Sequence, residues 1–344
     1  MQAVKNTLAE NLGSPAQNLA PNQHKFSLDQ VPDLSGKVAL ITGGSEGIGY
    51  GCTHTLITHN ISKLFCLSLS AEVVNDAKTA ITEELGADAA SKFIWLQCDL
   101  SDWSATKNAA EEIKSRTDRL DIVINNAARG IMTAQLAPSN GVDLHMAANL
   151  MGHVVLTSHL LPLLRKTADA GDKVRIVNLA SNAHENAPPD TKFLNLEELN
   201  HDYGPVAQYG RSKLADILYS RYLTRHLTSQ HPNILVNATH PGVVETAQTR
   251  KHILEPYPLA GYGLKYLLNP LKKDIFEGCV STMYAATSIE GSGEYICPPA
   301  IPEKGNEQSR DEKLGEQMMS LTRKLVADNT KPESVEKGCP FRDY

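Results

Sequence analysis

Short runs of β-branched and apolar residues alternate with longer segments of helical periodicity along most of the chain after Lys37. The apolar runs have the length of buried strands, and Gly, Asn or Ser residues follow them. In order, they are KVALITGG, KLFCLSL, KFIWLQCDL, LDIVINNAA, VRIVNLAS and ILVNATHPG. Between them, AEVVNDAKTAITEELG and SATKNAAEEIKSR place apolar residues at helical spacing and charges elsewhere. This alternation predicts βαβ units, and therefore an α/β fold with a doubly wound parallel sheet.

The same pattern predicts one main domain over residues 37–300, because no internal repeat and no linker interrupts it. Residues 1–36 follow neither period and predict an irregular N-terminal arm. Residues 301–344 carry one helical pattern, near residues 311–327, and end in a polar stretch. We expect this C-terminal extension to pack on the domain rather than to form another one.

The composition is typical of an ordinary folded protein that is large enough to bury a core. The 344 residues are 41% hydrophobic and 21% charged. Basic and acidic residues number 33 and 39, give a net charge of −6, and are spread along the chain. Because no basic run could follow a phosphate backbone, nucleic acid is not an expected partner.

Cysteine usage and targeting signals bear on the location of the protein. The six cysteines form no Cys-x-x-Cys pair and no metal-ligand spacing with histidine, so we expect no metal, no disulfides and a reducing compartment. The first residues lack the apolar core of a secretory signal. No run reaches the roughly 18 apolar residues of a membrane span, and prolines and glycines interrupt the nearest candidate, residues 257–273. These features predict a cytoplasmic protein without a stable membrane span.

The stretch TGGSEGIG, residues 42–49, follows the first expected strand and opens a helix. In this context, glycines let the backbone approach the pyrophosphate of a dinucleotide, which the N–H groups at a helix N-terminus attract. Gly43 would make the tight turn, Gly47 would admit the pyrophosphate, and Gly49 would let helix and strand pack closely. An ordinary glycine-rich turn is the alternative, and the strand before the loop and the helix after it count against that alternative.

The spacing of these glycines, Thr-Gly-x-x-x-Gly-x-Gly, resembles the short-chain dehydrogenase/reductase family. CDLS after the third strand and NNAA at the end of the fourth carry the same resemblance, although Ala128 stands where the family has glycine. The resemblance implies a single Rossmann-type domain that binds a nicotinamide dinucleotide. Besides the three glycines, it places at the cofactor Ser45, Ile48, Asp99, Leu100 and Asn126.

The choice between NAD and NADP depends on side chains about 20 residues beyond the glycine loop. An acidic residue there binds the ribose hydroxyls of NAD, whereas an arginine suits the 2′-phosphate of NADP. The second strand ends SLSAE, which places neither at that point. Ser70 can hydrogen-bond to a phosphate, whereas Glu46 would repel one. Proteins that are similar in layout are more often NADP-dependent, so we expect NADP, with NAD as the alternative.

The stretch AQYGRSKLAD, residues 207–216, places a tyrosine one helical turn before a lysine. Hydride transfer at a carbonyl needs an acid or a base at the oxygen, and a tyrosine with a pKa of about 10 is a slow base at neutral pH. An ammonium group at i+4 lies on the same helix face and lowers such a pKa by roughly 1 to 3 units. Tyr209 and Lys213 meet this demand. The alternative is a solvated helix face, as expected around Tyr219.

The resemblance also places Tyr209 and Lys213 at the cofactor, where Lys213 would hold the nicotinamide ribose, and it assigns further residues to the reaction. Ser181, at the end of the fifth strand, would hold the substrate oxygen for the tyrosine. Asn149 interrupts an apolar helical face and matches the asparagine that orders a water chain to the lysine. The Pro-Gly turn at residues 241–242 would place backbone amides beside the nicotinamide carboxamide, with Val244 and Thr246 next to it.

Together these features predict an NAD(P)-dependent oxidoreductase that interconverts a carbonyl and an alcohol, with Tyr209 exchanging the proton. The stretch between Ser181 and Tyr209 is long and resembles the retinol-dehydrogenase-like and WW-domain-oxidoreductase-like branch. We expect this stretch and residues 243–275 to contact a moderately apolar small molecule, of secondary-metabolite or lipid and retinoid-like type, with His184 either lining that pocket or packing. The rival interpretation is a catalytically inactive nucleotide sensor or scaffold on the same fold. Similar proteins commonly form homo-oligomers through their helices.

Overall fold

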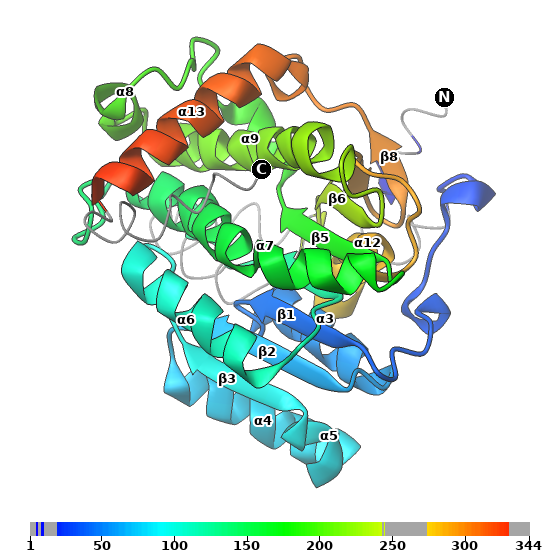
Figure 1. Ribbon diagram of the computed structural model, residues 1–344. Helices are drawn as coiled ribbons and strands as arrows, with labels where there is room; N and C mark the ends of the chain where they lie inside the picture. Colours follow the sequence, from blue (N-terminus) through cyan, green and yellow to red (C-terminus); the bar gives the residue numbers. More distant parts are fainter. Residues whose placement is uncertain (1–4, 6–7, 10–18, 243, 245–273, 330–344) are drawn as a thin grey trace, which may run out of the picture.

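The computed structural model describes residues 5, 8–9, 19–242, 244 and 274–329 of the chain. Its centre is an eight-stranded sheet in the order β3-β2-β1-β4-β5-β6-β7-β8 (Figure 1). Neighbouring strands from β3 to β7 are parallel, and β8 is antiparallel to β7. The expected α/β fold, a single domain with a doubly wound Rossmann-type sheet, is confirmed.

The strands expected from the apolar runs are all present, and two short strands follow them. They are β1 (Val38–Thr42), β2 (Lys63–Ser68), β3 (Phe93–Gln97), β4 (Ile122–Asn125), β5 (Val174–Leu179), β6 (Ile234–Thr239), β7 (Tyr295–Cys297) and β8 (Ile301–Glu303). β1, β4 and β6 are buried along their whole length. Their sequences are continuous apolar runs because helices cover both faces of a parallel sheet.

Helices pack on both faces, and each face has its own apolar core. One face carries α3 (Gly47–Thr58), α4 (Ala71–Leu85), α5 (Ala87–Ser91) and α12 (Ile275–Thr287). The other face, toward the viewer in Figure 1, carries α6 (Trp103–Arg116), the π-helical turn η3 (Met146–Gly152), α7 (His153–Asp169) and α9 (Pro205–Leu223). The shorter elements are η1 (Asn22–His24), η2 (Leu28–Gln30), η4 (Asn182–Asn186), α8 (Leu196–Asn200), η5 (Thr224–Thr228) and η8 (Gln308–Arg310).

Side chains at the helix starts explain where several helices begin. Ser70 caps α4 by accepting a hydrogen bond from the N–H of Val73, and Asp102 caps α6 by accepting one from Ala105. α9 starts with Pro205, whose missing N–H is not needed in the first turn. Each cap satisfies backbone groups that the helix itself leaves free, and is worth about 0.5–2 kcal/mol.

The last described helix, α13 (Glu312–Asn329), runs across α9 in Figure 1. Its residues Met318, Met319 and Leu325 are buried in the same core cluster as the apolar residues of α9. Arg221 of α9 donates from Nη2 to the carbonyl oxygen of Lys304 at 2.9 Å, which fixes the chain between β8 and α13. The outer side of α9 is therefore covered by the chain's own C-terminal part.

One helical stretch, Met146–Asp169, is long and apolar enough to cross a membrane by length and composition. However, 83% of its most apolar window is buried inside the protein. It consists of η3 followed by α7, which packs against α6 on one side and against β5 and β6 on another. Its apolar character is that of a central core helix.

Candidate active site

The candidate site lies at the carboxyl ends of the central strands. The strand order reverses between β1 and β4, and doubly wound sheets bind ligands in the crevice at such a point. The glycine loop follows β1, Asn126 follows β4, and Ser181 follows β5. α9 reaches the same edge, because Lys213 Nζ donates to the carbonyl oxygen of Leu179, at the end of β5, at 2.6 Å.

Glycine shapes the loop between β1 and α3. Gly43 and Gly47 have φ angles of 63° and 54°, where a residue with a side chain is strained. A Cβ on Gly49 would overlap the carbonyl oxygen of Gly43 and lie 2.6 Å from Asn126 Nδ2. Ser45 is buried in the loop, and Ile48 is half-buried in the first turn of α3. Backbone without side chains thus lies next to the N-terminus of α3. There its free N–H groups can bind a pyrophosphate.

Asn126 fastens the end of β4 to the glycine loop. Its Nδ2 donates to the carbonyl oxygens of Thr42, at 2.9 Å, and of Gly43, at 3.2 Å. In return, Thr42 Oγ1 accepts from the backbone N–H groups of Asn126 and Ala127, both at 2.9 Å. The Asn126 side chain therefore holds the loop in shape, beside the position at which the resemblance places the cofactor.

The residues expected near the adenosine half of a dinucleotide lie at the ends of β2 and β3. Ser70 is exposed, and its Oγ accepts from Val73 N at 3.3 Å, which leaves the hydroxyl proton for another acceptor. Asp99 is exposed, and its Oδ1 accepts from the N–H and the Oγ of Ser101, at 2.8 and 2.7 Å. Leu100 is buried against Gly152, where a Cβ would lie 2.8 Å from Leu100 Cβ.

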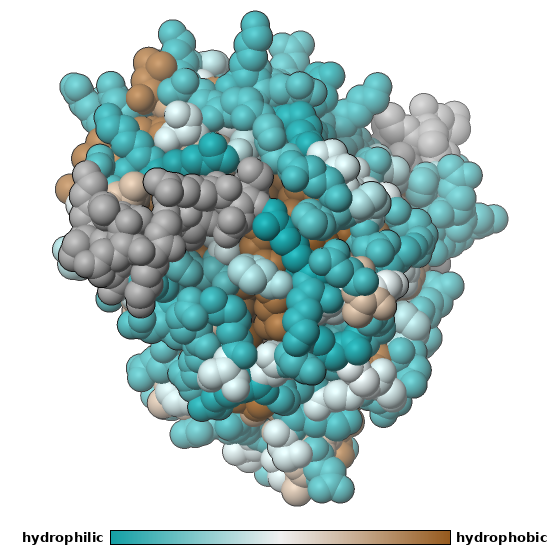
Figure 2. Space-filling model, viewed as in Figure 1, coloured by the Kyte–Doolittle hydropathy of each residue, from teal (hydrophilic) through white to brown (hydrophobic). Residues whose placement is uncertain are grey.

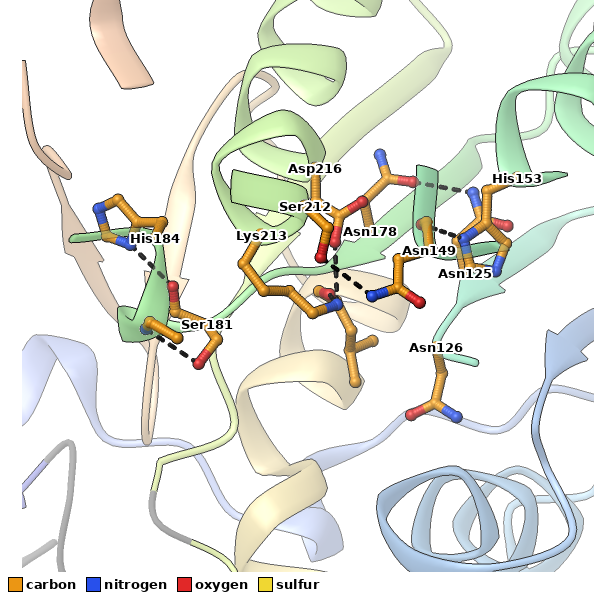
Figure 3. Close-up of polar contacts among 12 residues, drawn as sticks. Asn125, Asn126, Asn149, His153, Asn178, Ser181, His184, Ser212, Lys213 and Asp216 are labelled. Atoms are coloured by element: carbon orange, nitrogen blue, oxygen red, sulfur yellow. Dashed lines mark hydrogen bonds and ion pairs between the residues drawn. The ribbon is translucent and has the colours of Figure 1, made fainter. Parts of the chain in front are cut away.

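Asn149 lies on the π-helical turn η3, and its buried amide joins three parts of the chain. Oδ1 accepts from the N–H of Arg129 at 2.7 Å, and Nδ2 donates to the carbonyl oxygen of Arg129 at 3.0 Å. Nδ2 also donates to Ser212 Oγ at 2.9 Å, and Ser212 Oγ donates to the carbonyl oxygen of Tyr209 at 2.8 Å. In Figure 3 the side chains of Asn149, Ser212 and Lys213 point toward one another. Asn149 thus ties the segment after β4 to the tyrosine turn of α9.

Lys213 is buried at the centre of this group. Its Nζ donates to Leu179 O at 2.6 Å and to Asp216 Oδ2 at 2.9 Å. The same atom lies 5.7 Å from the centroid of the Tyr209 ring. The spacing predicted that the two side chains share a helix face, and the structure places the ammonium of Lys213 above the Tyr209 ring.

Burial and pairing act in opposite directions on these charges. Burial alone would lower the pKa of Lys213, but the charges of Asp216 and Tyr209 outweigh burial, so its pKa is raised. Burial raises the pKa of Asp216 to about 6, against the opposing effect of Lys213. On α7, burial lowers the pKa of His153 to about 4, and Lys213 contributes to this lowering. At neutral pH the group therefore consists of an ammonium, a carboxylate and a neutral imidazole.

Ser181 begins the turn η4. Its Oγ accepts from Ala183 N at 3.1 Å and donates to Asn182 Oδ1 at 3.3 Å, and its side chain is half-buried. Behind it, His184 is 1% exposed, with Nδ1 2.7 Å from Ser181 O and Nε2 accepting from Asn306 N at 3.2 Å. The His184 ring packs edge-on against Tyr295 at 5.3 Å. These contacts support the packing role of His184, which braces the Ser181 turn from behind, rather than a pocket-lining role.

The remaining predicted residues lie at the end of β6. Gly242 has a φ of 83°, as a Pro-Gly turn requires. Val244 is buried and packs on α12, where a Cβ on Gly278 would lie 2.5 Å from Val244 Cγ2. Thr246 and nearly all of the expected substrate segment 243–275 lie outside the described residues.

Sequence reasoning missed two groups that complete the constellation. Asp216 is the counter-charge of Lys213, and Ser212 connects Asn149 to the tyrosine turn. Both lie within one turn of Lys213 in the sequence, and a carboxylate three residues after the lysine, on the same helix face, was the available signal. Two further buried hydrogen bonds join the strands to α9: Asn125 Nδ2 donates to Asn178 Oδ1 at 2.8 Å, and Asn178 Nδ2 donates to Ser220 Oγ at 2.9 Å.

A model of the family described as short chain dehydrogenase matches residues 37–192. A protein of Colletotrichum higginsianum named short chain dehydrogenase/reductase dpchH is 32% identical over 86% of this chain and 76% of its own length. The chain belongs to the short-chain dehydrogenase family. Among family members, a Neurospora crassa protein named as a mitochondrial oxidoreductase, bli-4, is 54% identical over 100% of this chain and 84% of its own length. A human protein named polyprenol dehydrogenase is 29% identical over 84% of both chains.

Two solved structures are similar to this one in fold. A crystal structure from Mycobacterium paratuberculosis superposes with a TM-score of 0.67 at 22% identity, and covers 88% of this chain and 97% of that one. The NADP complex of RhlG from Pseudomonas aeruginosa superposes with a TM-score of 0.57 at 26% identity, and covers 77% and 95%. Likeness at this level of identity shows the fold.

The expected cytoplasmic location is wrong by the same comparison, because the 54% identical relative is named as mitochondrial. The reasoning failed for a physical reason. Absence of an apolar signal core excludes only the secretory route, whereas mitochondrial import reads amphipathic segments, which that test does not detect. The relative also extends beyond the aligned region, since the match covers 84% of its length.

Proposed function

We propose that this short-chain dehydrogenase interconverts a carbonyl and an alcohol by hydride transfer, with a nicotinamide dinucleotide as the hydride carrier. The observation that carries the proposal is the placement of Lys213 Nζ over the Tyr209 ring, at the same sheet edge as the glycine loop. An acid–base group and a dinucleotide cradle at one edge are what this reaction requires.

The side chains have distinct parts in this proposal. Tyr209 gives its proton to the developing alkoxide in reduction and takes it back in oxidation. The Lys213 ammonium, with Nζ 5.7 Å from the centroid of the Tyr209 ring, attracts the negative charge that forms on the phenol oxygen as the proton leaves. The hydroxyl of Ser181 turns from its local partners in η4 to hold the substrate oxygen. Asn149 keeps the tyrosine turn in place through Ser212, and this contact gives it a positioning role.

The cradle fits a dinucleotide on the observations above: glycines that leave no room for a Cβ, a helix N-terminus, and Asn126 holding the loop. When bound, the nicotinamide supplies or accepts the hydride. We propose that Gly43, Ser45, Gly47, Ile48 and Gly49 hold the pyrophosphate and that Asp99, Leu100, Asn126, Val244 and Thr246 flank the rings.

We propose NADP as the preferred form of the cofactor. Ser70 is exposed at the end of β2 and keeps its hydroxyl proton for a phosphate oxygen. The RhlG structure, at 26% identity, is an NADP complex. Glu46, the exposed residue at the start of α3, would repel a phosphate and acts against this preference, and NAD is the alternative. Titration of the protein with NADPH and with NADH tests the choice: tighter binding of NADPH supports it, and tighter binding of NADH overturns it.

We propose that the substrate is moderately apolar. Leu194, Leu196 and Val206, in the long stretch before Tyr209, are exposed large hydrophobic residues. In Figure 2 apolar residues gather at the upper left, over α8. A relative named polyprenol dehydrogenase supports a lipid-like alcohol. Consumption of NADPH with aldehydes and ketones of increasing chain length tests this: we expect turnover to rise with chain length, whereas binding of NADPH with no turnover of any compound would favour a nucleotide sensor.

A further inference from the structure

A carboxylate that the reaction scheme above does not use lies inside the fold beside Lys213. The side chains of Lys213 and Asp216 are 4% and 6% exposed, and Nζ and Oδ2 are 2.9 Å apart. The two residues are three positions apart on α9, so they share a helix face. Figure 3 shows the Asp216 carboxylate reaching down to the ammonium, with the Asn149 amide to the right of it. An unpaired carboxylate at this depth would be very unfavourable. Removal of either charge therefore leaves the other one buried without compensation.

The ammonium is held from two sides. A lysine ammonium has three N–H donors, and Leu179 O and Asp216 Oδ2 accept two of them. Among the contacts of the described residues, this leaves one donor for a further partner. A long lysine side chain otherwise samples many rotamers, so two fixed acceptors determine where the third donor points.

We propose that Asp216 is a positioning residue, which fixes the Lys213 ammonium beside Tyr209 and preserves its positive charge inside the fold. The proposal rests on the function proposed above for Tyr209 and Lys213. Without a counter-charge, a fully buried lysine favours its neutral form, because burial penalises the charge. A neutral Lys213 would no longer attract the negative charge that forms on the Tyr209 oxygen during proton transfer. Asp216 therefore determines the highest pH at which Lys213 stays charged and supports proton transfer by Tyr209.

The other titratable groups near the pair do not mask this effect. From α7, His153 is neutral at and above neutral pH, since burial lowers its pKa to about 4. From η4, burial also lowers the pKa of His184. The described parts of β5 and η3 near the pair offer a backbone carbonyl and neutral amides. On α9 itself, Tyr209 is the titratable group that acts on Lys213 besides Asp216. The charged groups of η5, η8 and α13 meet the far end of the helix, around Arg221 and Arg225.

Direct titration of Lys213 tests the proposal without turnover. Protein with ¹³C-labelled lysine ε-carbons is titrated by NMR, and Lys213→Met assigns the signal. We expect the wild-type signal to titrate above the usual lysine value of about 10.4. In Asp216→Asn, which keeps the shape and removes the charge, the midpoint should fall by about 1 to 3 pH units, because an opposite charge at this distance is lost.

Two further variants and a control complete the test. Asp216→Glu keeps the charge, and its midpoint should stay near the wild-type value. Asp216→Ser replaces the asparagine variant if that one does not fold, with the same expected direction. Glu83→Gln removes an exposed carboxylate on α4 and should leave the Lys213 midpoint at the wild-type value. An unchanged midpoint in folded Asp216→Asn or Asp216→Ser would overturn the proposal.

The pH profile of kcat/KM for alcohol oxidation connects the titration to the reaction. In Asp216→Asn the alkaline limb should move to lower pH by the same amount as the Lys213 midpoint. A moved midpoint in a protein that turns over no alcohol would refute the proposed function and leave the ion-pair role intact. A moved midpoint with an unmoved alkaline limb would show that Asp216 does not control the reaction through Lys213.

Discussion

Replacement of Gly49 by alanine tests whether the glycine loop is a cradle for a dinucleotide. A Cβ at this position overlaps the carbonyl oxygen of Gly43 and lies 2.6 Å from Asn126 Nδ2 and 2.8 Å from Gly43 C. Ordinary contacts between such atoms are well over 3 Å. Two of the three neighbours are backbone atoms between β1 and α3, so a side-chain rotation cannot relieve the overlap. The loop itself must move away from the start of α3.

The overlap sets the size of the effect. Overpacking of this kind costs about 1–3 kcal/mol, and the helix propensity of alanine returns up to about 1 kcal/mol. The melting temperature should therefore fall by no more than a few degrees, and the protein should stay folded. Binding of the dinucleotide should weaken much more, by roughly 10- to 100-fold, since a displacement of about 1 Å misaligns every N–H group at the helix start.

The assay is a titration with NADPH followed by calorimetry, with a melting curve for each variant. Gly291→Ala is the matched control, because the nearest atom to a Cβ there is Glu294 Cγ at 3.9 Å. We expect the control to bind NADPH and to melt as the wild type does. Wild-type affinity in folded Gly49→Ala would refute the reasoning about the loop.

Three other predictions follow from single side chains. Because burial lowers the pKa of His153 to about 4 from an ordinary value of 6.5, its contribution to stability is present above pH 6.5 and is lost as the pH falls through 4. The loss should reach about 3 kcal/mol. When the free energy of unfolding is measured with urea at several pH values, it should depend less on pH in His153→Gln than in the wild type. Asn149→Ala leaves the Arg129 backbone and Ser212 unpaired, so kcat should fall more than about 10-fold with NADPH binding unchanged; loss of binding instead would contradict its positioning role. Met319→Ala, at a fully buried position, should cost about 2–5 kcal/mol by thermal melting, and a cost below 1 kcal/mol would show that α13 is dispensable.

The six central strands could be predicted because each is a buried apolar run that ends in a turn. β7 and β8 could not, since each has three residues and Pro302 lies in the second of them. Such short strands show no period, and their partners, β6 and β7, become apparent only when the sheet is assembled. The π-helical turn at Met146–Gly152 was also hidden, because the apolar pattern through it is continuous.

Some residues of the candidate site could also be predicted from the sequence, whereas others could not. Spacing along the chain was enough to place Tyr209 and Lys213 on one helix face and the glycines at a helix start. Asp216 was missed because charged residues on a helix usually face solvent, whereas α9 is buried on nearly all sides by η4, β6 and α13. The roles of the two histidines depended on packing as well: His153 connects Thr42 to Asn149 O, at 2.8 Å each, which no spacing reveals.

The rate of NADPH oxidation with an apolar aldehyde, compared between the wild type and Tyr209→Phe, tests the central claim most directly. The variant removes one hydroxyl and keeps the ring beside Lys213. We predict that it binds NADPH as the wild type does and loses about 100- to 10,000-fold in kcat, the usual contribution of a positioned acid. Equal rates in the two proteins would contradict proton transfer by Tyr209.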